Sequence, residues 1–189
     1  MKVILASASP RRSMILEQSG IPFSVIVSET DETINCNGPE QVVMELSKRK
    51  AEDVAKKCPG KDLVIGADTV VAAGGKILGK PKDAEDAAAM IRLISGSVHQ
   101  VFTGVTLVHE GKSHTFYAVT DVTVADLSEA EIDSYVNSGE PFDKAGAYAI
   151  QGLFGKYITG IRGEYNNVVG LPVAMIVEKC RELKIPLTE

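Results

Sequence analysis

The sequence predicts an α/β fold, because segments typical of buried strands alternate with segments typical of amphipathic helices along its 189 residues. The clearest strand is the apolar run at residues 64–71. The clearest helix begins at Pro39 and runs to about residue 57, with apolar residues at helical spacing. Two long segments, 98–108 and 113–125, are rich in Val, Thr and aromatic residues and predict an antiparallel hairpin. This hairpin would mark a second lobe within a single domain of residues 1–189.

The N-terminal segment predicts a strand, a loop and a helix. Residues 2–6 are an apolar run, and Ser9, Pro10 and Gly20 are residues typical of a helix N-cap, first turn and end. The free backbone N–H groups of a helix N-terminus favour an anion, and the neighbouring arginines Arg11 and Arg12 would strengthen phosphate binding. The alternative is a pair of solvated surface arginines beside an ordinary cap.

An acidic stretch follows the predicted second strand at residues 22–27. It holds Glu29, Asp31 and Glu32 within four residues. Such a stretch is typical of a solvated loop, and the functional alternative is a metal ligand or a general base at the end of a strand. In the following helix Lys48, Arg49 and Lys50 are consecutive, and the one beside Ala51 could turn inward.

The second half of the chain contains several local start and stop signals. Gly74-Gly75 predicts a hairpin turn, Asp83 predicts the N-cap of a helix over 83–95, and Ser128 with Glu131 predicts a capping box. Residues 139–152 are dense in small and polar residues, which suits either close packing around a ligand or a structural junction. The remaining predicted elements are a strand at 156–161, a turn at 163–172 and a final helix from 172 to about 183.

Asp68 is a carboxylate within an apolar strand, where an uncompensated charge is unfavourable. The turn that contains Lys80 and Lys82 follows about twelve residues later. One interpretation is an acid and its counter-charge on either side of a small anionic ligand. The other is a strand-end Asp that caps the next turn.

Composition narrows the functional classes. A net charge of −5 argues against a general nucleic-acid or membrane-surface binder. The three cysteines, Cys36, Cys58 and Cys180, have no zinc or disulfide spacing, which fits a reducing cytoplasm. No apolar run approaches the length of a membrane span, and the N-terminal run is too short for a signal peptide. The composition therefore predicts a cytoplasmic protein.

Several separate stretches occur in collinear order from Leu5 to Pro172. They are Leu5-Ala6-Ser7-Ala8-Ser9-Pro10-Arg11-Arg12, Gly66-Ala67-Asp68-Thr69-Val70-Val71, Gly79-Lys80-Pro81, Gly139-Glu140-Pro141, Asp143-Lys144-Ala145-Gly146-Ala147-Tyr148, Ile150-Gln151-Gly152 and Asn167-Val168-Val169-Gly170-Leu171-Pro172. Each stretch is short, but the set is specific. Together the stretches resemble the Maf family of nucleoside triphosphate pyrophosphatases.

The resemblance implies a mixed twisted sheet with flanking helices and two lobes around a central cleft, as in the inosine triphosphate pyrophosphatases. It implies metal-assisted hydrolysis between the α and β phosphates, which yields a nucleoside monophosphate and pyrophosphate. A divalent cation, Mg²⁺ or alternatively Mn²⁺ or Co²⁺, and a homodimer are implied with it. The implied roles are Asp68 as catalytic acid/base and metal ligand, Glu32 as metal ligand, and Ser7, Arg12, Lys50 and Lys80 as phosphate ligands.

Three positions distinguish the branches of the family by the base of the substrate. The branch that acts on dTTP and UTP has Arg, Thr and Gln where the branch that acts on 7-methyl-GTP has Trp, Gln and Glu. This sequence has Arg11, Thr69 and Gln151, which resembles the pyrimidine branch. The alternatives are a pyrophosphatase for modified nucleotides such as 7-methyl-GTP, and a nucleotide-binding regulator of cell division with little turnover.

Overall fold

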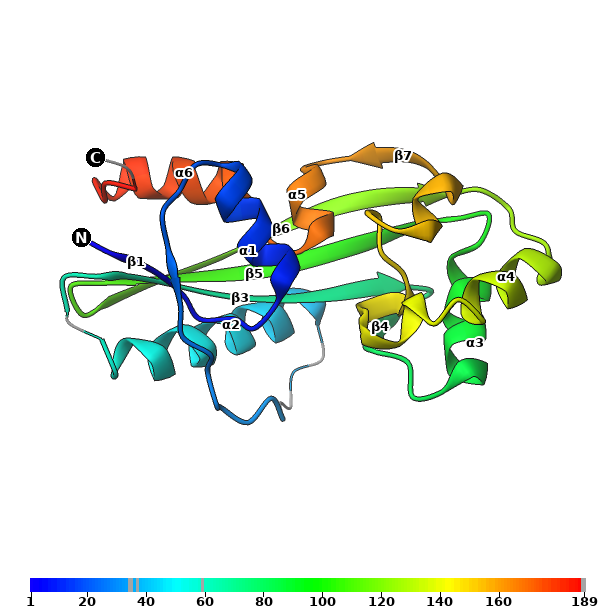
Figure 1. The fold of residues 1–189 in the computed structure, drawn as a ribbon, viewed down its shortest axis with the longest axis horizontal. Helices are drawn as coiled ribbons and strands as arrows, with labels where there is room; N and C mark the ends of the chain where they lie inside the picture. Colours follow the sequence, from blue (N-terminus) through cyan, green and yellow to red (C-terminus); the bar gives the residue numbers. More distant parts are fainter. Residues whose placement is uncertain (34–35, 37, 59, 188–189) are drawn as a thin grey trace. The chain divides into compact units, whose positions relative to one another are not determined.

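The structure is a computed structural model that describes residues 1–33, 36, 38–58 and 60–187. These residues form a seven-stranded mixed sheet in the order β2-β1-β3-β5-β6-β7, with β4 paired to β3 (Figure 1). The predicted mixed sheet with flanking helices is therefore confirmed. The strands are β1 (Val3–Leu5), β2 (Ser24–Val25), β3 (Leu63–Ala73), β4 (Lys76–Leu78), β5 (Val98–His109), β6 (Lys112–Val124) and β7 (Ile158–Arg162). The α-helices are α1 (Pro10–Gln18), α2 (Pro39–Ala55), α3 (Ala84–Ile94), α4 (Glu129–Val136), α5 (Tyr165–Val169) and α6 (Val173–Glu182).

The chain divides into two compact units. Unit 1 comprises Met1–Asp68, Thr103–Ala118 and Gly170–Glu189, and unit 2 comprises Thr69–Phe102 and Val119–Val169. Strands β3, β5 and β6 contribute residues to both units. None of the described helices is both long enough and apolar enough to cross a membrane.

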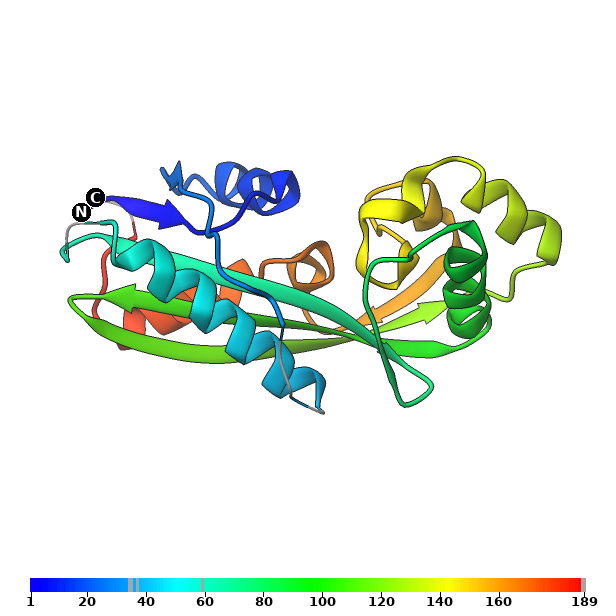
Figure 2. The ribbon, with the colours of Figure 1, turned by 90° about the horizontal axis from the view of Figure 1, so that it is seen from below.

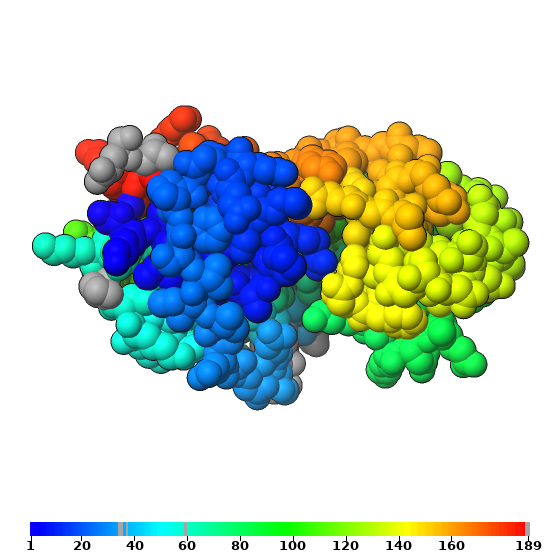
Figure 3. Space-filling model, in the orientation of Figure 1, coloured from blue at the N-terminus to red at the C-terminus, as the bar shows by residue number. Residues whose placement is uncertain are grey.

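The first three strands of unit 1 pair in parallel. Strand β1 pairs in parallel with β2 and with β3, so that Ile4 lies opposite both Ser24 and Val64. Helix α2 lies on one face of the strands of this unit and α6 lies on the other (Figures 1 and 2). The N-terminal segment, which includes α1 and the chain after β2, forms most of the face of unit 1 seen in Figure 3. Apolar side chains such as Leu5, Leu63 and Ile65 are fully buried between these layers.

The close approach of α2 to the sheet depends on glycines in the strands. A Cβ atom on Gly66 of β3 would lie 2.7 Å from the Cβ of Ala51 on α2. A Cβ atom on Gly104 of β5 would collide with the carbonyl group of Val43 on the same helix. Since no larger residue fits at these two points, the glycines fix the depth at which α2 packs.

Two predicted elements of the chain needed correction. The second strand is Ser24–Val25 rather than residues 22–27, because it is an edge strand that pairs only with β1, and Val25 and Val27 are about half exposed. The predicted turn at 163–172 contains helix α5. The amide of Asn167 on this helix donates to the carbonyl of Val101 at 3.0 Å and to Thr120 Oγ1 at 2.9 Å. These contacts are distant in sequence, so no local pattern indicates the helix.

Unit 2 confirms the predictions that rested on local signals. Strands β3 and β4 pair antiparallel across Gly74 and Gly75, whose φ values of 55° and 72° suit a tight hairpin turn. The carboxylate of Asp83 accepts a hydrogen bond from the backbone of Asp86 at 2.8 Å and caps α3. Ser128 and Glu131 form the predicted capping box of α4. Each signal involves residues within a few positions of one another, which explains why the sequence was sufficient.

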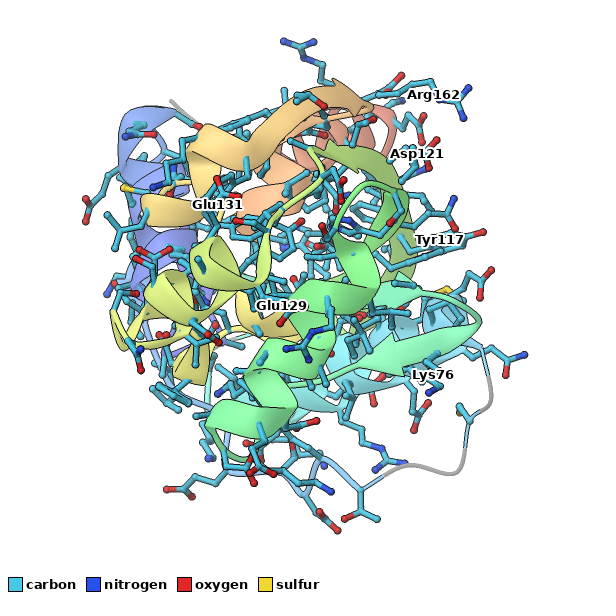
Figure 4. The ribbon with its side chains drawn as sticks, turned by 90° about the vertical axis from the view of Figure 1, so that its right-hand side faces the viewer. Lys76, Tyr117, Asp121, Glu129, Glu131 and Arg162 are labelled. Carbon is cyan, nitrogen blue, oxygen red and sulfur yellow. The ribbon has the colours of Figure 1, made fainter. Side chains whose placement is uncertain are left out.

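Ion pairs on the surface of unit 2 join neighbouring elements. The guanidinium of Arg92 on α3 contacts Glu129 on α4 at 2.6 Å, and Arg162 on β7 contacts Asp121 on β6. Glu129, Asp121 and Arg162 are labelled in Figure 4. Exposed pairs of this kind contribute little to stability. The core beneath them therefore holds the unit together, with Ile91, Ile132 and Phe154 fully buried.

The small-residue segment at 139–152 contains short 3₁₀ helices, Glu140–Asp143 and Ala145–Ala147. The carboxylate of Glu140 accepts hydrogen bonds from the Tyr135 hydroxyl at 3.1 Å and from the backbone of Leu153 at 2.8 Å. Gly146 has a φ of 70°, and a Cβ atom there would lie 2.9 Å from Val71. Packing within unit 2 thus accounts for Glu140 and Gly146.

Candidate active site

Asp68 lies on β3 in unit 1 and is 9% exposed. Burial raises the pKa of its carboxyl, while the nearby cations Lys50 and Arg12 act in the opposite direction. A carboxylate with an increased proton affinity suits general acid/base chemistry better than an ordinary surface Asp does. The strand-end capping role considered for Asp68 does not describe this environment, since Asp68 lies inside the strand.

Lys50 of α2 joins two carboxylates. Its ammonium nitrogen lies 2.7 Å from Asp68 Oδ1 and 2.8 Å from Glu32 Oε1. Of the three consecutive basic residues on α2, Lys50 is therefore the one that reaches Asp68. It does so because Gly66, two residues before Asp68, lets the helix approach β3 at Ala51, the residue after Lys50.

The three carboxylates of the acidic loop after β2, those of Glu29, Asp31 and Glu32, make different contacts. Asp31 Oδ1 accepts hydrogen bonds from the backbone and hydroxyl of Thr33, at 2.9 and 2.8 Å, and so forms a local turn. Glu29 is exposed, with its nearest ion-pair contact to Lys57 at 3.8 Å. Glu32 is the one of the three that contacts Lys50. Glu32 therefore differs from Glu29 and Asp31 in its contact with Lys50, a difference that the sequence alone did not indicate.

Two α2 residues that sequence reasoning did not select hold this loop. The carboxylate of Asp53 accepts hydrogen bonds from the Ser28 hydroxyl at 3.1 Å and from the backbone of Glu29 at 3.2 Å. The guanidinium of Arg49 donates to the carbonyl of Thr33 at 2.8 Å. Their contacts span 16 to 25 positions, so local patterns carry no signal for them.

Ser7 and Arg12 form a second part of the site at the N-terminus of α1. The buried guanidinium of Arg12 donates to Ser7 Oγ at 2.9 Å and to the carbonyl of Gly170 at 2.8 Å. Burial lowers the pKa of Arg12 from its ordinary value, and the charge of Asp68 opposes this effect. Arg12 is therefore fixed in place rather than solvated. Gly170, which the sequence placed in a motif without a role, supplies the carbonyl that holds Arg12.

The other predicted site residues are placed as follows. Arg11 is partly exposed on α1 in unit 1. Thr69 follows Asp68 on β3, and Lys80 and Gln151 are exposed residues of unit 2. The structure therefore brings together Ser7 with Arg12, and Lys50 with Asp68 and Glu32, within unit 1. For all of the predicted site residues the roles in catalysis, metal binding and substrate binding stay predictions.

The described residues contain no group of three or more His, Cys, Asp or Glu side chains that could hold a metal ion by themselves. Mg²⁺, however, is commonly bound by one or two carboxylates together with substrate phosphates. Asp68 and Glu32 contact the same ammonium group, so both carboxylates already face one cation position. The residues present thus fit a divalent ion that completes its coordination with phosphate oxygens and water.

Comparison with known proteins identifies the family of the chain. A family model described as Maf-like protein matches residues 2–183. The chain belongs to the Maf family. Ser7, Arg12 and Asp68 lie in the stretches that resemble the family, and unit 1 places Ser7 beside Arg12 and Asp68 beside Lys50.

Three bacterial relatives are named dTTP/UTP pyrophosphatase. The Agathobacter rectalis protein is 50% identical over 201 residues, covering 97% of this chain and 98% of the relative. The Lachnoclostridium phytofermentans protein is 46% identical over 193 residues, covering 100% and 98%. The Bacillus cereus protein is 46% identical over 188 residues, covering 99% and 98%.

Among solved structures, the Ham1 protein of Staphylococcus aureus is similar with a TM-score of 0.51 and 12% sequence identity. The match covers 97% of this chain and 100% of the Ham1 chain. At this level of identity the likeness shows the fold alone, and it agrees with the predicted fold class.

Proposed function

We propose that this Maf-family chain hydrolyses dTTP and UTP to the nucleoside monophosphate and pyrophosphate. The observation that carries the proposal is the buried Asp68 carboxylate held beside Lys50 and near Arg12, in a chain whose full-length relatives are named dTTP/UTP pyrophosphatase. Arg11, Thr69 and Gln151 support the choice of a pyrimidine base.

In the proposed reaction a water oxygen bonds to phosphorus at the α–β anhydride linkage, and the anhydride P–O bond breaks to release pyrophosphate. Asp68 orients the water and accepts its proton, which its burial favours. A divalent cation bound by Asp68 and Glu32 would neutralise charge on the phosphates. Little covalent chemistry is required of the protein, so positioning and charge neutralisation dominate the rate.

Cationic side chains of the candidate site would hold the triphosphate. The fixed guanidinium of Arg12 offers planar, multidentate recognition of phosphate oxygens, and Ser7 lies within hydrogen-bond distance of it. Lys50 and Lys80 would contribute further ammonium groups. Gln151 carries both amide donors and an acceptor, which suits the edge of uracil or thymine.

The setting proposed for this activity is a homodimer in the cytoplasm. The three cysteines of the chain are free, which suits a reducing compartment. The dimer rests on the resemblance to the family. Light scattering of the purified chain tests it, with a monomeric mass as the contradicting result.

Pyrophosphate release from a panel of nucleoside triphosphates, with Mg²⁺ present, tests the proposal. Faster turnover of dTTP and UTP than of 7-methyl-GTP is expected. Equal turnover of dTTP and 7-methyl-GTP would reject the assignment of the base. Tight nucleotide binding with negligible pyrophosphate release would instead favour a nucleotide-binding regulator.

A further inference from the structure

The ammonium group of Lys50 occupies the position between the two carboxylates that a divalent ion would need. It lies 2.7 Å from Asp68 Oδ1 and 2.8 Å from Glu32 Oε1. These two oxygens can therefore be no farther apart than the sum of the two distances. A single small cation that bound both would draw them closer together, because metal–oxygen bonds are shorter than these ammonium–oxygen contacts. Lys50 and a divalent ion would then compete for the same pair of oxygens.

We propose that Lys50 is an internal counter-ion that couples metal binding to triphosphate binding. Without a nucleotide, the ammonium group of Lys50 is bound to Asp68 and Glu32 and keeps their affinity for a divalent ion low. When a triphosphate binds, its oxygens accept hydrogen bonds from the ammonium group of Lys50. The two carboxylates are then free to bind the divalent ion. This inference rests on the proposed metal-assisted pyrophosphatase function. It adds that binding of the nucleotide promotes binding of the metal ion.

The balance of charge in unit 1 supports this exchange. Two cations, Lys50 and Arg12, and two carboxylates, Asp68 and Glu32, interact electrostatically around Asp68, so their formal charges cancel. A divalent ion alone would leave an excess of positive charge beside two cations. A triphosphate brings several negative charges and removes that excess. Metal and nucleotide should therefore bind better together than either does alone.

The three side chains also differ in exposure in the way that an exchange requires. The Lys50 and Asp68 side chains are 14% and 13% exposed, whereas the Glu32 side chain is 65% exposed. Water screens the contact with Glu32, so that contact is the weaker of the two. Lys50 ends in a compact ammonium group on a flexible stem, which can turn toward a phosphate without movement of α2.

Thermodynamic linkage makes the coupling measurable from either side. If the nucleotide strengthens metal binding by a given factor, the metal must strengthen nucleotide binding by the same factor. Removing the charge of Lys50 should raise metal affinity in the absence of nucleotide. It should also reduce the factor by which the nucleotide increases metal affinity. A residue that served only as a phosphate ligand would have no effect on metal binding without nucleotide.

The experiment compares Lys50→Gln with Lys48→Gln in the otherwise intact chain. Lys48 is exposed on the same helix, so its replacement removes an equal charge without touching the carboxylates. Mn²⁺ binding is measured by water-proton relaxation, with and without α,β-methylene-dTTP, which resists cleavage at the α–β linkage. Relaxation separates protein-bound Mn²⁺ from Mn²⁺ held by free nucleotide.

Without nucleotide, Lys50→Gln should bind Mn²⁺ about tenfold more tightly than the unmodified chain, the factor expected if Lys50 leaves the carboxylates free about a tenth of the time. Lys48→Gln should bind Mn²⁺ like the unmodified chain. The nucleotide-dependent gain should be clearly smaller in Lys50→Gln. Equal Mn²⁺ affinity of Lys50→Gln and Lys48→Gln without nucleotide would overturn the inference.

A second variant keeps the inference testable if Lys50→Gln does not fold. Glu32→Gln alters an exposed side chain and leaves the contact of Lys50 with Asp68 in place. It should weaken Mn²⁺ binding in the presence of the analogue, and unchanged binding would overturn the inference. Pyrophosphate release from dTTP by the unmodified chain is measured in parallel. Release without the predicted Mn²⁺ effects rejects this inference alone, whereas absence of release rejects the proposed function.

Discussion

Lys50 Nζ lies 2.7 Å from Asp68 Oδ1, and these two residues, one on helix α2 and the other on strand β3, are 18 positions apart in sequence. The contact exists because Gly66 has no side chain at the point where α2 crosses β3. It places a cation against a buried carboxylate whose pKa is raised by burial. The catalytic role proposed for Asp68 depends on this arrangement.

Asp68→Asn should separate catalysis from binding. The amide has the same shape but cannot accept the proton of the attacking water, so turnover of dTTP should fall by at least about 100-fold. Nucleotide binding, measured by calorimetry, should remain detectable because Arg12 and Lys50 are still present. Glu17→Gln, which alters an exposed carboxylate on α1, is the control and should keep normal turnover. Normal turnover in Asp68→Asn would refute the role of Asp68.

Gly66→Ala should affect both stability and activity. The added Cβ atom would lie 2.7 Å from Ala51 Cβ, so α2 must move away from β3 and carry Lys50 with it. The free energy of unfolding should fall by about 1–3 kcal/mol, and pyrophosphate release should slow. In Gly60→Ala the new Cβ atom meets nothing within 4 Å, so urea unfolding should show little change. A Gly66→Ala chain as stable and active as the parent would contradict this account of the packing.

The stability of unit 2 should depend on pH through His99. This buried ring lies 2.7 Å from the Tyr148 hydroxyl, and burial lowers its pKa from 6.5 to about 4. Between these values the unfolded chain binds a proton that the folded chain does not. Stability present above pH 6.5 is therefore lost as the pH falls toward 4, by about 3 kcal/mol in total.

Urea unfolding at several pH values measures this effect. His99→Gln retains a group that can hydrogen-bond to Tyr148 but does not titrate, so its free energy of unfolding should fall less between pH 6.5 and 4 than that of the parent. The carboxylates of the chain titrate in both proteins and cancel in the comparison. Parallel pH profiles for the two proteins would show that His99 is not the group responsible.

Gln151→Glu should change the preference between bases. A carboxylate lacks the amide donors, so one hydrogen bond to the pyrimidine carbonyl would be lost. The ratio of kcat/KM for dTTP to that for 7-methyl-GTP should decrease about tenfold, the effect of one unmatched hydrogen bond. Gln41→Glu, which alters an exposed glutamine on α2 of unit 1, is the control. An unchanged ratio in Gln151→Glu would reject base recognition by this residue.

The sequence was sufficient wherever the deciding residues are near neighbours. The turn at Gly74-Gly75, the Asp83 cap and the Ser128–Glu131 box all depend on contacts within four positions. Helix α5 was missed because Asn167 is held by Val101 and Thr120, 66 and 47 positions away. The contact of Arg12 with Gly170 spans 158 positions and likewise leaves no local pattern.

The candidate site was predictable in its residue types but not in its contacts. An Asp within an apolar strand indicates a compensated charge, yet the sequence first suggested Lys80 as the partner. The structure pairs Asp68 with Lys50, because the packing depth of α2 is set by Gly66. It also selects Glu32 among three acidic neighbours, since Asp31 is used in its own turn.

The most direct test of the proposed function is pyrophosphate release by the purified chain with dTTP, UTP and 7-methyl-GTP in the presence of Mg²⁺. The proposed function predicts rapid release from dTTP and UTP, slow release from 7-methyl-GTP, and release from dTTP that is slower by at least about 100-fold in Asp68→Asn. Absence of pyrophosphate from dTTP and UTP, despite measurable nucleotide binding, would contradict it.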